Sequence, residues 1–151
     1  DELAEALPGH DVVLSALGVR PPAAFRPHTV LQDCAASTVA AMTRAGVGRL
    51  VLVSAAVLFP EKGVRFAFCR WLLTQVRRDL EAAEQIVRAT SLEWTIARPP
   101  RLIHTSDEGY RATRDALPSG AFSMSFRAVA AFMLDTVEHR THVHQIVGLA
   151  S

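Results

Sequence analysis

Three short segments of small, polar or backbone-shaping residues each follow an apolar run, and they are where this chain could do chemistry. They are Ser15-Ala16-Leu17-Gly18, Ser54-Ala55 and Arg98-Pro99-Pro100-Arg101. In an open parallel sheet, ligands bind beyond the carboxyl ends of the strands, so these segments would gather along one edge. Small residues there let a flat ligand approach the backbone, and a serine hydroxyl can hydrogen-bond it. Taken alone, each segment also has the composition of an ordinary strand end.

The other reactive side chains are less suited to a site. His139, His142 and His144 lie close in sequence, and His142 and His144 would share one face of a strand. No carboxylate or cysteine completes a metal site with them, so no metal is predicted. Asp107-Glu108 lies in a polar loop and is typical of a solvated turn.

Composition narrows the class of protein. The 16 basic and 15 acidic residues give a formal net charge of +1, so neither nucleic acid nor an anionic membrane is expected as the main partner. Two cysteines, Cys34 and Cys69, do not make a disulfide framework, and a reducing cytoplasm is the simplest compartment. No apolar run approaches the roughly 20 residues of a membrane-spanning helix.

The elements that would position the three segments alternate between strand and helix. The expected strands are Asp11–Leu17, Arg49–Ala55, Glu93–Ala97 and His144–Leu149, each a short run apolar on both faces. The expected helices are Pro27–Ala45, Phe66–Ala89 and Ser125–Glu138, and His104–Arg114 is expected to be loop. This order predicts one α/β domain over residues 1–151, with a mainly parallel, Rossmann-like sheet and helices on both faces.

The helical periodicity also predicts which side chains are buried. The first helix would bury Val30, Cys34, Thr38, Ala41 and Ala45 and end at Gly46. The second would bury Trp71, Leu72, Val76, Leu80, Ala83 and Val87 and expose Arg77, Arg78, Asp79, Glu81, Glu84 and Arg88. The third would bury Val129, Phe132, Met133 and Val137.

Three blocks resemble the atypical short-chain dehydrogenases of the NAD(P)H-binding, NmrA-like group, which includes flavin and biliverdin reductases. They are residues 11–18, 40–55 and 83–102, and their order and spacing match over nearly the whole chain. The run Trp94-Thr95-Ile96-Ala97-Arg98-Pro99 is the most specific of them.

The resemblance implies a reductase domain that holds NADP, or NAD, and passes hydride to a small-molecule acceptor such as a flavin or quinone. It places Ala16, Leu17 and Gly18 along the cofactor, and Ser54 and Ala55 beside the nicotinamide, with Ser54 as the candidate catalytic residue. Pro99 and Pro100 match the loop that covers the nicotinamide end. Arg101 would pair with an acidic substrate or a cofactor phosphate, or else be a solvated surface arginine.

The chain also departs from the pattern. Its only Gly-x-Gly is Gly46-Val47-Gly48, which precedes a strand instead of opening a helix, so the glycine-rich turn that cradles a diphosphate is absent. No lysine follows Tyr110, so the Tyr-x-x-x-Lys pair of classical short-chain dehydrogenases is absent as well. We therefore expect only the C-terminal part of such a domain, inactive by itself, with weak or no NADP(H) binding.

Two other interpretations stay open. The chain could belong to a non-catalytic, NmrA-like regulator that senses the dinucleotide and acts through a protein partner, or it could have no independent role.

The first expected strand raises a question of pairing. In this topology it normally lies in mid-sheet, so without the preceding strands Asp11–Leu17 becomes an edge. No charge, proline or bulge interrupts Val12–Leu17. We expect this edge to pair with a second copy in a homodimer, to be covered by a rearranged segment, or to leave the chain unstable.

Overall fold

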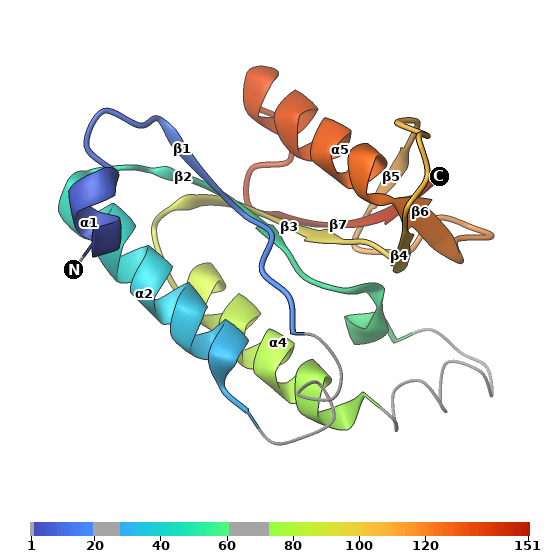
Figure 1. Cartoon of the computed structure of the whole chain (residues 1–151), viewed down its shortest axis with the longest axis horizontal. Helices are drawn as coiled ribbons and strands as arrows, with labels where there is room; N and C mark the ends of the chain where they lie inside the picture. The colour runs from blue at the N-terminus through green and yellow to red at the C-terminus, as the bar shows by residue number, and fades with distance from the viewer. Residues whose placement is uncertain (1, 20–27, 61–72) are drawn as a thin grey trace.

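The chain folds around a five-stranded, mainly parallel sheet. The computed structural model describes residues 2–19, 28–60 and 73–151 (Figure 1). In spatial order the strands are β1 (Val12–Ser15), β2 (Arg49–Val53), β3 (Glu93–Arg98), β7 (Gln145–Ala150) and β5 (Arg111–Arg114). The first four are parallel to one another, and β5 runs antiparallel to β7. The predicted α/β fold with a mainly parallel, Rossmann-like sheet is confirmed.

Helices cover both faces of the sheet, as predicted (Figure 1). The helices α2 (Val30–Ala45) and α4 (Thr74–Arg88) lie on one face, and α5 (Phe126–Glu138) lies on the other. A short helix, α1 (Glu2–Ala6), packs against α2, and a 3₁₀ turn, η2 (Ala56–Leu58), follows β2. A separate parallel pair is formed by β4 (Arg101–Ile103) and β6 (Ser123–Ser125).

The core consists of two apolar clusters, one on each side of the sheet. Successive side chains of a strand point to opposite faces, so Leu50 and Leu52 of β2 join the cluster with α2 and α4, whereas Val51 joins the cluster with α5. Burial on both sides explains why the strand is apolar throughout.

The register of α2 corrects two predictions. The helix begins at Val30 instead of Pro27, which lies outside the described residues, and Val30 itself is 50% exposed. The buried residues are Leu31, Ala35, Thr38, Ala41 and Met42. Alanines on neighbouring faces of this helix leave two adjacent stripes almost equally apolar, so periodicity alone could not choose between them. The predicted end is confirmed, because Gly46 has a φ of 72° and donates its N–H to the carbonyl of Met42.

The helix α4 is described from Thr74, so Cys69, Trp71 and Leu72 lie outside the described residues. Leu80, Ala83 and Val87 are buried as predicted. The predicted exposure of Asp79 and Glu84 is wrong, since each is only 3% exposed. Both carboxylates bind partners from other elements, described below.

The C-terminal region holds two further corrections. The segment 104–114 is not all loop, because Arg111–Arg114 forms the edge strand β5, whose exposed side chains lack an apolar face that would reveal it. The last strand begins at Gln145, and His142 and His144 precede it in a turn with φ of 55° and 54°, so they do not share a strand face. Within β7, a Cβ at Gly148 would lie 2.0 Å from the carbonyl oxygen of Ala116, which requires glycine there.

Candidate functional site

The carboxyl ends of β1, β2 and β3 lie side by side at one edge of the sheet, because all three strands are parallel and adjacent. Hydrogen bonds continue the pairing past the strands. Ser54 donates its N–H to the carbonyl of Ala97 at 2.7 Å, and Ala56 donates to the carbonyl of Pro99 at 2.8 Å. The structure thus brings the segments around Ser54 and Pro99 together, as expected.

Ser54 has the features of a ligand-binding group. It is 8% exposed, and its Oγ is buried without a hydrogen-bond partner among the described residues. It lines a cavity of about 20 Å³ together with Ser15 and Leu17 on the sheet side and Leu31 and Leu80 on the helix side. That volume has room for about one water molecule. A buried polar group without a partner costs about 1–3 kcal/mol, which a bound ligand or water would recover.

The remaining predicted site residues line the same edge at different depths. Ala16 and Gly18 are exposed beyond the end of β1, and Ala55 is half-buried between Ser54 and η2. Pro99 is buried and Pro100 is half-buried. Arg101 is exposed at the start of β4, so the structure places it on the surface as the first residue of the second sheet.

An ion pair that sequence reasoning missed holds the Pro99 segment in place. Arg98, directly before the prolines, donates to Glu84 of α4 through Nε at 2.9 Å and through Nη2 at 2.6 Å. Its guanidinium also lies 4.8 Å from the ring centre of Phe59. Arg98 therefore connects α4, the end of β3 and Phe59, the residue after η2. The sequence around Arg98 gives no sign of a partner 14 residues away.

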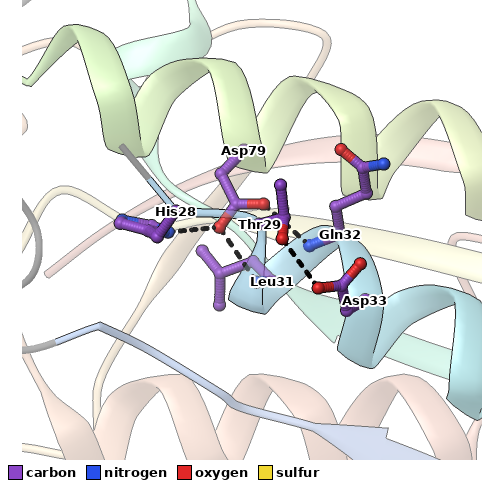
Figure 2. A network of polar contacts seen from close by, with 6 residues as sticks. All are labelled: His28, Thr29, Leu31, Gln32, Asp33 and Asp79. Atoms are coloured by element: carbon purple, nitrogen blue, oxygen red, sulfur yellow. Dashed lines mark hydrogen bonds and ion pairs between the residues drawn. The ribbon is translucent and has the colours of Figure 1, made fainter. Parts of the chain in front are cut away.

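A second missed group lies at the start of α2. Figure 2 shows Asp79 of α4 pointing at the first turn of α2, where it accepts the N–H groups of Leu31 and Gln32, each at 2.9 Å. His28 contacts the same carboxylate through Nδ1 at 2.7 Å. The helix has no cap of its own, because the hydroxyl of Thr29 binds Asp33 instead. Asp79 therefore caps α2 from a neighbouring helix.

Tyr110 and the histidines lie apart from this edge. Tyr110 donates its hydroxyl to Asp135 at 2.7 Å and packs edge-on against Phe132, on the α5 side of the sheet. Burial, together with the hydrogen bond to Asp135 and its negative charge, raises the pKa of Tyr110 to about 12. His144 contacts the carbonyl of Leu92 through Nε2 at 2.9 Å, which is a structural role.

The C-terminal histidines do not form a metal site with one another. Instead Asp135, Glu138 and His139 gather their ligand atoms within 4.8 Å, so carboxylates do lie near one histidine, contrary to expectation. The spacing of three and four residues along α5 explains this cluster. The Asp107 turn is solvated as predicted, and its carboxylate accepts the N–H of Gly109 at 3.0 Å.

The glycines of Gly46-Val47-Gly48 lie at the opposite end of β2 from Ser54. Gly46 ends α2. In the part of the chain that the structure describes, no atom beyond the adjoining residues lies within 4 Å of a Cβ placed on Gly46 or Gly48. This turn is therefore a helix end, as expected, and does not cradle a diphosphate beside Ser54.

Comparison with known proteins agrees with this arrangement. The NAD(P)H-binding family model matches residues 1–140, and the chain belongs to that family. It is thus an NAD(P)H-binding domain with a Rossmann-like fold. A comparison with curated protein sequences finds no match.

Solved structures share the fold at low sequence identity. A short-chain dehydrogenase/reductase from Veillonella parvula in complex with NADP superposes with a TM-score of 0.78 and 20% identity, over 99% of this chain and 67% of that one. An oxidoreductase from Lactococcus lactis superposes with a TM-score of 0.79 and 21% identity, over 99% of this chain and 66% of that one. A Rossmann-fold NAD(P)-binding protein from Shigella flexneri superposes with a TM-score of 0.73 and 23% identity, over 99% of this chain and 64% of that one. The chain spans about two thirds of the length of these structures.

Among the described residues, no helix is both long enough and apolar enough to span a bilayer.

Proposed function

We propose that this chain binds NAD(P)H at the edge formed by β1, β2 and β3 and serves a reductase that acts on a flavin, a quinone or a similar conjugated acceptor. The observation that carries the proposal is the buried, unpartnered hydroxyl of Ser54 at the carboxyl ends of the strands. The Veillonella protein with the same fold is in complex with NADP. Within the family, the run Trp94–Pro99 supports a place among the NmrA-like flavin and biliverdin reductases.

The residues at the edge suit the nicotinamide end of a dinucleotide. When bound, the nicotinamide supplies the hydride. Ser54 can donate its free hydroxyl to the ring's amide or to the acceptor, and Ala16 and Gly18 leave the backbone accessible to a flat ring. Pro99, buried beside Ser54, shields the edge from water. The chain contributes no glycine-rich turn for the diphosphate, so we propose that its own affinity for the dinucleotide is weak.

The test is a titration of the chain with NADPH and NADH, followed by fluorescence, together with NADPH oxidation in the presence of a flavin or menadione. Ser54→Ala should weaken binding or slow oxidation about tenfold, which corresponds to one lost hydrogen bond. Ser37→Ala, on the exposed side of α2, is the matched control and should change neither quantity. Equal behaviour of the two variants would contradict the role of Ser54, and no binding of either nucleotide would contradict the function.

A second candidate is a non-catalytic, dinucleotide-sensing domain. The bond from Tyr110 to Asp135 favours it, because the chain's single tyrosine is thereby turned away from proton transfer at the edge. NADPH oxidation with any of these acceptors would contradict this second function.

A further inference from the structure

Cys34 is a free thiol on the wall of the cavity that contains Ser54. The helix α2 contributes Leu31, Cys34 and Ala35 to this wall, whereas the ends of β1 and β2 form the opposite wall. Cys34 lies at the edge of the buried stripe of α2, because it follows Leu31 by three residues and directly precedes Ala35. It is half-buried and lines a cavity, which is the exposure of a thiol that can react rather than of an inert core cysteine.

The cavity offers few polar side chains besides this thiol. Its lining is mostly leucine, valine and alanine, and the other polar side chains are those of Ser15 and Ser54. The Oγ of Ser54 is buried and forms no hydrogen bond with any described residue, so it is not bonded to the sulfur of Cys34. A polar atom placed between the two walls would therefore give the Ser54 hydroxyl the partner that the folded chain lacks.

The size of the cavity limits what can react there. Its volume of about 20 Å³ has room for about one water molecule. Hydrogen peroxide is only one oxygen atom larger than water, and the single oxygen that it leaves on a sulfur takes about the space of that water. Oxidation beyond the sulfenic acid needs a second peroxide molecule, for which the filled cavity has no room. The cavity thus fits a small oxidant and a product that carries one added oxygen.

We propose that Cys34 is a reversible oxidation site for hydrogen peroxide and that its sulfenic acid blocks the Ser54 cavity; the effect on the dinucleotide rests on the proposed function. The sulfur attacks one peroxide oxygen, so an S–O bond forms and the O–O bond breaks. The sulfur loses two electrons, and the leaving oxygen takes them with the thiol proton to become water. Ser54 then donates its hydroxyl to the sulfenic oxygen and can no longer donate it to the nicotinamide or the acceptor.

The proposed reaction supplies its own oxidant. A reduced flavin or a hydroquinone passes two electrons and two protons to dioxygen, which yields hydrogen peroxide and the oxidised acceptor. A dithiol reverses the modification, because it returns the Cys34 thiol and is itself released as a disulfide together with one water molecule. Oxidation of Cys34 therefore lowers NADPH consumption when peroxide accumulates, and reduction restores it.

The first test measures the thiol chemistry without any dinucleotide. Cys69 lies outside the described residues, and Cys69→Ala leaves Cys34 as the only cysteine of the chain. In this background, peroxide followed by dimedone should label Cys34, which mass spectrometry of its peptide measures. When dimedone is added after a delay, Ser54→Ala should shorten the half-life of the sulfenic acid about fivefold, because one hydrogen bond is lost. Ser37→Ala, on the exposed side of α2, should leave the half-life unchanged. No label, or equal half-lives in the two serine variants, would overturn the assignment.

The second test measures the effect on the dinucleotide. After treatment with peroxide and its removal, Cys69→Ala should bind NADPH at least about tenfold more weakly, and dithiothreitol should restore the affinity. Cys34→Ala should bind NADPH equally before and after the same treatment. An equal loss in Cys34→Ala, or unchanged affinity when Cys34 is oxidised, would overturn the blocking of the cavity. If the untreated chain bound no NADPH, the proposed function and the effect on the dinucleotide would both be wrong, and the dimedone half-lives would still decide the oxidation site.

Discussion

Two buried serines of this chain differ in a way that bears on function. Ser125 accepts the N–H of Ala128 at 2.8 Å and donates to the carbonyl of Asp107, so it caps α5 and is fully explained by the fold. Ser54 is also buried but has no partner for its hydroxyl. The Ser54 hydroxyl adds nothing to the stability of the fold that an alanine at this position would lack. Ser54 is therefore the strongest single indication of a bound ligand.

Tyr110 gives the first prediction at this scale. Its pKa is raised to about 12 by burial, by the hydrogen bond to Asp135 and by that residue's charge. Because it is the only tyrosine, tyrosinate absorbance near 295 nm reports on it alone. We expect only about a tenth of it to be ionised at pH 11, against about nine tenths for a free tyrosine. If nine tenths of Tyr110 were ionised at pH 11 while the chain was still folded, the hydrogen bond to Asp135 would be contradicted.

The same shift makes the free energy of unfolding depend on pH. The folded-state pKa lies above the unfolded value of 10.0, so the contribution of Tyr110 is fully present below pH 10 and is lost as pH rises from 10 toward 12. Tyr110→Phe should therefore be less stable by about 1 kcal/mol at pH 7, and this difference should shrink above pH 10. Urea unfolding of both proteins at pH 7 and pH 10.5 measures it.

At the scale of elements, α4 is held by two buried carboxylates. Asp79 fixes it to the start of α2, and Glu84 fixes it to the end of β3 through Arg98. Both contacts lie next to the proposed site, because Leu31 lines the Ser54 cavity and Pro99 follows Arg98. The position of the helix and the shape of the site are thus set by the same residues.

We expect Glu84→Ala to lower the free energy of unfolding by about 3 kcal/mol, because it leaves the largely buried guanidinium of Arg98 without its carboxylate. Glu81→Ala is the matched control. Glu81 pairs with Arg77 at 3.3 Å on the surface of the same helix, and its loss should cost less than about 0.5 kcal/mol. Urea unfolding followed by tryptophan fluorescence compares them, and similar losses in both variants would contradict the role of the buried pair.

The carboxylates of Asp79 and Glu84 also show which features of the fold the sequence does not predict. The strands β2, β3 and β7 and the end of α2 could be predicted, because apolar runs and a helix-ending glycine are local signals. The helical pattern predicts that Asp79 and Glu84 lie on the solvent face, since a charged residue in a helix is usually exposed. Their burial depends on His28, 51 residues away, and on Arg98, 14 residues away. Such partners become visible only when the sheet has placed the helices.

The same reasoning applies to the site. Ser54 and Pro99 could be predicted to meet, because both follow buried parallel strands. His28 could not be predicted, since nothing in its neighbourhood distinguishes it from a loop histidine until the helix start brings Asp79 beside it.

At the scale of the whole molecule, β1 is an incomplete edge. Among the described strands it pairs only with β2, and its side chains are half-buried at best, with Leu14 41% exposed. Leu17, just beyond the strand, is 51% exposed. Val13 packs into the cluster on the α2 side, whereas Leu14 points to the other face, where α5 lies over β3 and β7 instead. Both the hydrogen-bonding edge and one apolar face of this strand are therefore open.

We propose that a second copy of the chain covers this edge. If β1 paired antiparallel with β1 of a second copy across a two-fold axis, hydrogen bonds between the strands would satisfy the free backbone groups of both. The pairing would also bury Leu14 of each copy. Light scattering after size exclusion should then show a dimer whose fraction rises with concentration. Leu14→Lys should shift it to monomer, because two lysines would face each other across the axis. Leu134→Lys places the same charge on the exposed side of α5 and should leave the dimer unchanged. If the wild-type chain stays folded and monomeric at every concentration, the edge of β1 is stable while exposed to solvent, and the proposed dimer is wrong.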